Sequence, residues 1–161
     1  MHRRIENKLR SVVLASMAVI LAGCASHGAL RPFSTDGCSL FPDRSPVGHA
    51  DWAWCHCCVV HDLAYWRGGT AKDRRDADDA LKACVRNDSR STTLATAMFL
   101  GVRVGGGPYL YTSFRWGYGW PFLRPYGQLT DEEKMHSDTL EQEYKAHHPA
   151  LVCRYEEAQK P

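Results

Sequence analysis

Residues 57–65, CCVVHDLAY, lie within the segment 51–66, whose apolar side chains recur at the spacing of a helix. Asp51 is a suitable N-cap for this segment, and Gly68-Gly69 is a typical stop signal after its last turn. The sequence therefore predicts a first helix over residues 51–66.

A second helix is predicted directly after the first. It begins at Thr70, where Asp73 completes a capping box with a shorter carboxylate, and it runs to about Asn87. The short connection between the two helices indicates that they are antiparallel. Apart from Asp78, the charged run 73–79 is expected to be a solvated helix face.

The C-terminal half divides into three predicted segments. Residues 91–104 are apolar enough for a third, buried helix. Residues 109–126 carry eight aromatic side chains interrupted by glycine and proline, which favours an irregular loop or a short hairpin. These rings either cover the core or contact a membrane interface. Thr130 and Glu133 form a capping box for a polar helix that ends at about His147.

Chemically reactive side chains are concentrated on the first helix. Cys57, His61 and Tyr65 follow one another at intervals of four residues, so a helix places them on one face. Asp62 lies about 100° further round and points elsewhere. A neutral histidine beside a carboxylate is an effective general base, because the carboxylate fixes the tautomer and stabilises the imidazolium.

The segment Cys57-Cys58-Val59-Val60-His61-Asp62-Leu63-Ala64-Tyr65 resembles the signature CC-x-x-HD-x-C-Y of the secreted phospholipase A2 family. Ala64 is the one named position that differs, since the family has cysteine there. On the partner helix, Asp78 is followed six residues later by Cys84, as in the family. Ala77 stands where the family has the cysteine that bonds to position 64. The loss of both ends of one bridge leaves no orphan thiol, which supports the alignment.

The resemblance implies a mostly α fold: a pair of antiparallel, disulfide-linked helices with loop-rich flanks and a C-terminal helix. It implies calcium-dependent hydrolysis of a phospholipid ester, with His61 as general base and Asp78 orienting it; Tyr65 lies on the same face and could also reach Asp78. The family's counterpart of Asp62 binds Ca²⁺, a hard cation that prefers oxygen ligands and would stabilise the oxyanion. Gly37-Cys38-Ser39 is the best candidate for the loop that supplies further calcium ligands.

The resemblance also implies the disulfide pattern. A bridge between Cys57 and Cys84 would hold His61 opposite Asp78, because moving back along one helix means moving forward along its antiparallel partner. The other two implied pairs are Cys38–Cys58 and Cys55–Cys153.

The N-terminus carries a targeting signal. Residues 1–10 are basic and polar, and the apolar stretch 11–23 is too short to span a membrane. Leu21-Ala22-Gly23-Cys24 resembles the bacterial lipobox, which implies that Cys24 is acylated and becomes the first mature residue. The expected location is a membrane-anchored exported lipoprotein. Because no aspartate follows Cys24, the outer membrane is favoured, with the protein facing the periplasm or the surface.

Length and charge limit the remaining functions. The 161 residues suffice for one domain, comprising the leader 1–23, the lipidated N-terminus and calcium loop 24–50, the two-helix catalytic core 51–90, and the aromatic and C-terminal region 91–161. Because the leader is basic, the mature chain is close to neutral. It therefore lacks the broad basic footprint of a nucleic-acid-binding protein, and the sequence indicates no particular protein partner.

Two alternatives remain for this core. Cys55, His56, Cys57, Cys58 and His61 are potential zinc ligands, although an exported protein would tend to oxidise the thiols. The more serious alternative is a non-catalytic envelope lipoprotein that uses the same scaffold for binding or structure. The histidine and aspartate would then form a buried polar pair between helices, and no oxygen cage for calcium would exist beside the first helix.

Overall fold

The computed structural model describes residues 29–42 and 54–148, and helices make up most of this part of the chain. They are α2 (Cys55–Arg67), α3 (Ala71–Ser89), α4 (Thr92–Gly105) and α5 (Asp131–His147). No strand occurs within the described ranges, so the aromatic segment contains no hairpin there. The prediction of a mostly α chain is confirmed.

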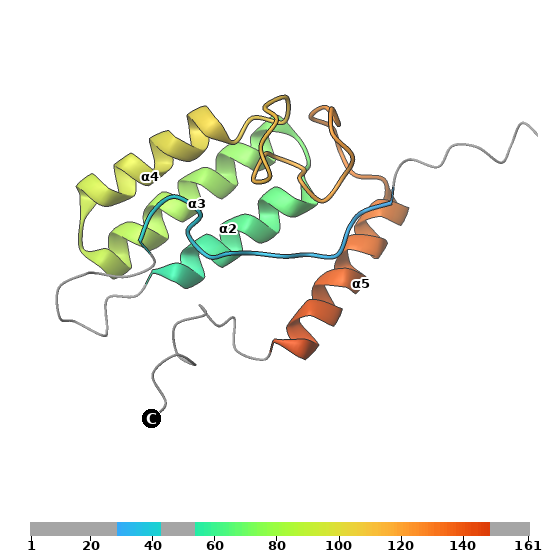
Figure 1. Ribbon diagram of the computed structural model, residues 1–161, viewed down its shortest axis with the longest axis horizontal. Coiled ribbons are helices and arrows are strands. Elements are labelled where there is room, and N and C mark those ends of the chain that lie inside the picture. The colour runs from blue at the N-terminus through green and yellow to red at the C-terminus, as the bar shows by residue number, and fades with distance from the viewer. Residues whose placement is uncertain (1–28, 43–53, 149–161) are drawn as a thin grey trace, which may run out of the picture.

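Two disulfides hold the helical core together. Helices α2, α3 and α4 lie side by side in alternating directions (Figure 1). Cys57 and Cys84 join α2 to α3 with their Cα atoms 5.8 Å apart, and Cys38 and Cys58 join the preceding loop to α2 at 5.2 Å. Both expected pairings are confirmed, and both distances are ordinary for disulfides. The third expected pair includes Cys153, which lies outside the described residues.

The helix ends follow the capping signals of the sequence. The hydroxyl groups of Thr70 and Thr130 each accept a hydrogen bond from the backbone three residues on, and both capping boxes are complete. Helix α3 continues two residues beyond the expected Asn87. The first helix differs more: α2 begins at Cys55. Trp54 occupies the N-cap position, but its side chain makes no capping hydrogen bond. The expected N-cap, Asp51, lies outside the described residues.

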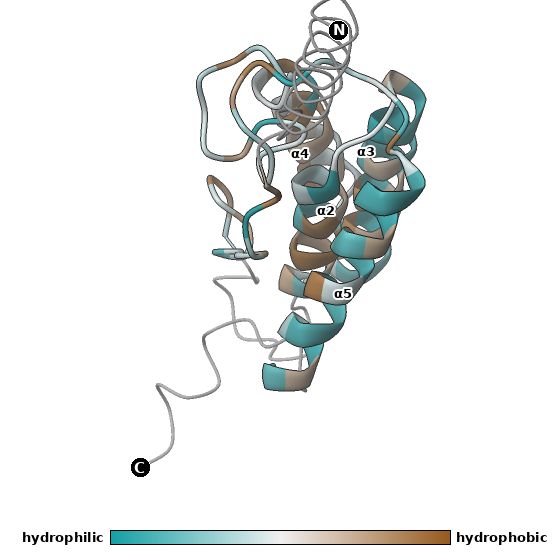
Figure 2. Cartoon of the chain, turned by 90° about the vertical axis from the view of Figure 1, so that its right-hand side faces the viewer, coloured by the Kyte–Doolittle hydropathy of each residue, from teal (hydrophilic) through white to brown (hydrophobic). Residues whose placement is uncertain are grey.

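Helix α2 is buried on two faces, which explains how it carries both the core and the site. One face packs with α3 and α4 in a cluster that contains Leu81, Val85 and Met98. The opposite face packs with the N-terminal segment and the aromatic loop in a cluster that contains Phe33, Trp66 and Trp120. Figure 2 agrees, since hydrophilic colour covers much of α3 and α5, whereas α2 shows hydrophobic colour.

Helix α4 is less buried than its apolar sequence suggests. Only Ala95 and Met98 are fully buried, whereas Val104 is 79% exposed and Leu100 is also largely exposed. One face packs against α3, and no described segment covers the other. The prediction of a helix was therefore right, but the prediction of a buried helix was wrong, because apolar content alone does not report which faces find partners.

The aromatic segment is an irregular loop that completes the C-terminal end of α2. The last carbonyls of a helix lack partners within the helix. Here the amides of Gly117 and Gly119 donate to the carbonyls of Tyr65 and Trp66 at 2.6 and 3.2 Å. The indole of Trp120 donates to the Arg67 carbonyl at 2.8 Å. The loop is thereby fixed at the C-terminal end of α2, about one turn beyond His61.

Within the described residues, no helix combines the length and apolar character needed to cross a membrane. The expected signal segment 1–23 and the acylated Cys24 lie outside these residues, so both stay predictions.

Candidate active site

His61 and Asp78 meet between α2 and α3 in the interior of the protein. The Nε2 atom of His61 lies 2.9 Å from Oδ1 of Asp78. The exposed fraction is 6% for His61 and 0% for Asp78. Since the hydrogen bond occupies one ring nitrogen, it orients the imidazole and leaves Nδ1 without a hydrogen-bond partner among the described residues. The helix spacing expected from the sequence thus produces the expected pair.

Asp78 is held by two further side chains. The hydroxyl of Tyr65 donates to Oδ1 at 2.8 Å, and Nη1 of Arg103, on α4, donates to Oδ2 at 2.7 Å. Burial by itself raises the pKa of Asp78, but the hydrogen bonds from His61, Arg103 and Tyr65 outweigh that effect, and the net pKa is below its usual value. Asp78 is therefore ionised and fully partnered at neutral pH.

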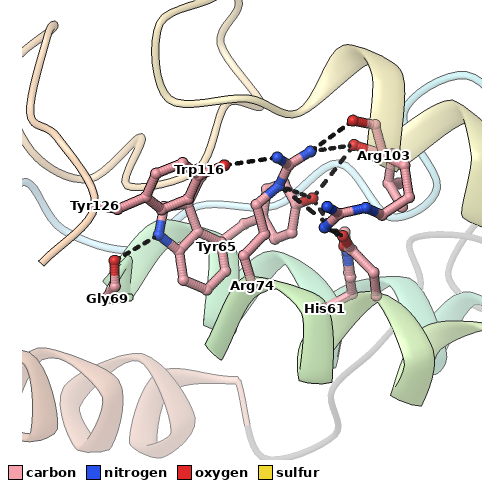
Figure 3. A network of polar contacts seen from close by, with 9 residues as sticks. His61, Tyr65, Gly69, Arg74, Arg103, Trp116 and Tyr126 are labelled. Carbon is pink, nitrogen blue, oxygen red and sulfur yellow. Dashed lines mark hydrogen bonds and ion pairs between the residues drawn. The ribbon is translucent and has the colours of Figure 1, made fainter. Parts of the chain in front are cut away.

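Arg74 links the dyad to the rest of the fold (Figure 3). Its Nε donates to the Tyr65 hydroxyl at 3.0 Å, and its Nη1 donates to the Tyr126 hydroxyl at 2.7 Å. Its Nη2 donates to the carbonyls of Val102 and Arg103, near the end of α4. The expectation that the run 73–79 is solvated was wrong for Arg74, which is buried because α4 and the loop cover it.

Asp62 faces the loop before α2 and not Asp78. Thr35 Oγ1 donates to Asp62 Oδ2 at 2.6 Å. The amide of Gly37 donates to Thr35 Oγ1 at 3.1 Å, and the Ser39 hydroxyl donates to Asp36 Oδ1 at 2.9 Å. Gly37 adopts a φ of 80°, which favours glycine and turns the loop toward α2. The predicted calcium ligands are therefore divided between α2, which carries Asp62, and the preceding loop, which carries Gly37 and Ser39. The hydrogen bond from Thr35 to Asp62 joins the two.

The carboxyl group of Asp62 is electrostatically uncompensated. Burial raises its pKa, the hydrogen bond from Thr35 offsets part of the rise, and the charge of Asp36 adds to it, so that the net pKa is about 7 instead of 3.8. Within the described residues, neither Asp62 nor Asp36 forms an ion pair with a basic side chain. A cation at this position would relieve the repulsion.

Two cavities meet at Asp62. A cavity of about 150 Å³ is lined by His61, Asp62 and the loop residues Gly37 and Ser39, together with apolar side chains of α3 and α4. A larger groove of about 1030 Å³ runs from Asp62 between the segment 29–40 and the aromatic loop. The histidine and the oxygen-rich loop therefore border the same space, and that space adjoins a groove large enough for a sizeable ligand.

The donor set beside Asp62 fits a hard cation. Its side chains offer only oxygen, from the carboxylates of Asp62 and Asp36 and the hydroxyls of Thr35 and Ser39. Ca²⁺ prefers such ligands, so these residues are the ones that could hold it. Zinc finds no comparable site in the described part of the chain: His56 and Asp88 lie near the sulfurs of Cys57 and Cys84, but those sulfurs are bonded to each other. The zinc-module interpretation is inconsistent with these disulfides.

Sequence reasoning missed four residues of the site. Thr35 and Asp36 directly precede Gly37, so their oxygen-bearing side chains were a usable signal. Arg74 lies four residues before Asp78 on the same helix face, which was also readable. Arg103 had no signal of this kind, because its contact with Asp78 depends on how α4 packs against α3.

Comparisons with family models, with curated proteins and with solved structures found no match to this chain. The resemblance to the secreted phospholipase A2 family therefore rests on the residues of α2 and α3 themselves.

Proposed function

We propose that this protein is a divergent phospholipase A2-like hydrolase that cleaves a phospholipid ester with a His61–Asp78 dyad. One observation carries the proposal. His61 is bound through Nε2 to a buried carboxylate at 2.9 Å, and the same histidine lines a cavity next to the oxygen-rich loop around Asp62. A buried histidine needs no such cavity if its role is only to join two helices.

In the proposed reaction, His61 accepts at Nδ1 the proton of a water molecule that attacks the ester carbonyl carbon. Asp78 keeps the ring oriented and stabilises the imidazolium, while Tyr65 and Arg103 keep Asp78 in place. His61 then returns the proton to the departing alcohol oxygen as the ester C–O bond breaks. The products are a fatty acid and a lysophospholipid.

Calcium belongs to the same proposal. Asp62 would hold the ion, with Asp36 and the loop Gly37–Ser39 contributing further oxygens. A bound Ca²⁺ would stabilise negative charge on the carbonyl oxygen during attack. The uncompensated carboxyl of Asp62 supports this assignment, because a permanent cation partner is missing among the described residues.

The test is fatty-acid release from mixed vesicles of phosphatidylglycerol and phosphatidylethanolamine, with millimolar calcium and then with a chelator. We expect calcium-dependent release by the wild type and its loss in His61→Ala. His56→Ala is the matched control, because His56 lies on the same helix but is exposed and paired with Asp88. Turnover that survives in His61→Ala would refute the mechanism.

A second candidate is a non-catalytic envelope lipoprotein that uses the scaffold for binding or structure. It is favoured by the fact that both carboxylates already have protein partners: Arg103 binds Asp78 and Thr35 binds Asp62. On this alternative, the wild type releases no fatty acid at any calcium concentration, and substitution of His61 or Asp78 affects only stability.

Either function is proposed to operate at a membrane, to which the chain would be anchored through acylated Cys24, on the periplasmic side or surface of the outer membrane. Cys24→Ser should leave an unprocessed precursor that retains residues 1–23. Normal processing and membrane attachment of that variant would contradict the anchor.

A further inference from the structure

Arg115 is a buried arginine without a carboxylate. Its exposed fraction is 5%, and within the described residues its guanidinium donates one hydrogen bond, from Nη2 to the Trp120 carbonyl at 2.8 Å. The guanidinium also lies over the Phe122 ring, 5.3 Å from its centroid. A buried cation normally has a paired anion, because desolvation of an unpaired charge is costly. Among the described residues, the buried carboxylate of Asp78 and the buried guanidinium of Arg74 follow that rule, since they form an ion pair.

A second arginine, the exposed Arg31 of the segment 29–42, contacts the same loop. Nη2 of Arg31 donates to the Tyr118 carbonyl at 2.6 Å, two residues before the carbonyl that Arg115 binds. No described acidic side chain forms an ion pair with Arg31 or Arg115. Both arginines line the groove of about 1030 Å³. The Thr112 hydroxyl in the same wall is buried, and it has no hydrogen-bond partner among the described residues.

The groove keeps positive and negative side chains apart. Desolvation lowers the pKa of Arg115, and the nearby charge of Arg31 lowers it further. The charge that acts on Asp62 is that of Asp36. Arg31 and Arg115 therefore repel each other, as Asp36 and Asp62 do, and neither pair neutralises the other. An anion between the two arginines would relieve the cationic repulsion.

We propose that Arg31 and Arg115 form an anion site in this groove for a phosphate group carried by a ligand that extends toward Asp62. Two planar guanidinium groups can bind the oxygens of one phosphate with several charge-assisted hydrogen bonds. The volume admits more than a phosphate ion, so we expect a phospholipid head group. This choice of ligand rests on the proposed hydrolase function, but the site itself does not.

The test is calorimetric binding in the presence of a chelator, with the full mature chain carrying His61→Ala so that no ligand is hydrolysed. The probes are inorganic phosphate, monomeric dihexanoylphosphatidylglycerol, and dihexanoylglycerol, which lacks the phosphate. We expect the phospholipid to bind at least tenfold more tightly than dihexanoylglycerol, because charge-assisted hydrogen bonds to phosphate would be lost.

Variants locate the site. Arg31→Gln should weaken phospholipid binding about tenfold. The matched control Arg75→Gln removes the same charge from an exposed position on α3 and should leave binding unchanged. Arg115→Lys keeps the charge but loses the planar fork, so it should also weaken binding. If Arg115→Lys fails to fold, which thermal unfolding would reveal, Arg31→Gln still decides the question.

The outcomes are separable from those of the hydrolase proposal. Equal binding of both lipids, or an equal effect of Arg31→Gln and Arg75→Gln, would overturn the anion site. Phosphate binding that matches phospholipid binding would support the site and identify free phosphate as its ligand. Arginine-dependent binding by a chain whose wild type releases no fatty acid would keep the site and reject hydrolysis.

Discussion

Both the dyad and the contacts between the three core helices depend on the carboxylate of Asp78. It joins α2 through His61 and Tyr65, and it joins α4 through Arg103. A carboxylate that only oriented a catalytic base would need one of these partners. Its effects on activity and on stability are therefore coupled, and variants have to be chosen so that the two can be measured separately.

We expect Asp78→Asn to destabilise the protein by roughly 3 kcal/mol, because it leaves Arg103 without its counter-charge next to a buried site. Tyr65→Phe keeps the charge of Asp78 and removes two hydrogen bonds, one to this carboxylate and one accepted from Arg74, so it should cost about 2 kcal/mol. Urea unfolding of both variants measures the difference. Equal losses in the two variants would show that Arg103 contributes little through Asp78.

Asp62 should make stability depend on pH. Its pKa of about 7 in the folded chain exceeds the ordinary 3.8, so the folded state holds the proton more tightly than the unfolded state. The resulting stabilisation is fully present below the unfolded pKa and is lost as the pH rises through about 7. Without calcium, the free energy of unfolding should fall by about 4 kcal/mol across that window.

Asp62→Asn is the control for this prediction. The amide does not titrate, so the variant should lose the slope and be the more stable chain at pH 8 without calcium. Calcium should raise the Tm of the wild type at pH 8 but not at pH 5, and it should not raise the Tm of Asp62→Asn. A wild-type profile that is flat between these pH values would contradict the burial assigned to the carboxyl.

At the scale of the elements, the sequence predicted those parts that depend on spacing along one helix. The resemblance to the phospholipase A2 signature, together with the intervals of four residues on α2 and of six on α3, anticipated the Cys57–Cys84 bridge and the approach of His61 to Asp78. The position of Arg74 beside Asp78 was readable from the spacing on α3, but its bonds to a backbone carbonyl of α4 and to a hydroxyl of the loop were not. Contacts of that kind arise only when separate elements pack.

The junction after α4 offers a steric test of the dyad. A Cβ on Gly106 would lie 2.5 Å from the Tyr65 ring and 2.8 Å from its hydroxyl oxygen. Gly106→Ala should therefore displace Tyr65 from Asp78 and lower both stability and any ester release. Gly127→Ala is the matched control, since its Cβ would meet nothing within 4 Å. Thermal unfolding and the vesicle assay measure the two effects, and unchanged values for Gly106→Ala would contradict the packing of Tyr65.

At the scale of the whole molecule, the aromatic segment serves two purposes that its composition could not separate. Trp116 and Trp120 are buried and complete the end of α2, whereas Leu123 is exposed, as is Tyr111, which lines the large groove. Which ring faces inward depends on the irregular path of the loop, and no periodicity in the sequence predicts that path. The alternative that the rings cover the core therefore holds for Trp116 and Trp120, and contact with a membrane interface stays a prediction.

The exposed part of this loop gives the last prediction, which concerns attachment to a lipid surface. Tyr111 is 88% exposed and packs edge-on against Phe122, 4.8 Å away, so the pair presents apolar area beside the groove. An amphipathic ring placed in this way favours the membrane interface. We expect a mature chain without the lipid anchor to cosediment with phosphatidylglycerol vesicles, and Tyr111→Ser to weaken the binding several-fold. Met135→Ser removes a side chain of similar exposure, 66%, from α5 and should not change the binding. If both variants lose binding equally, attachment is a general property of apolar surface; if neither does, the rings of this loop only cover the core.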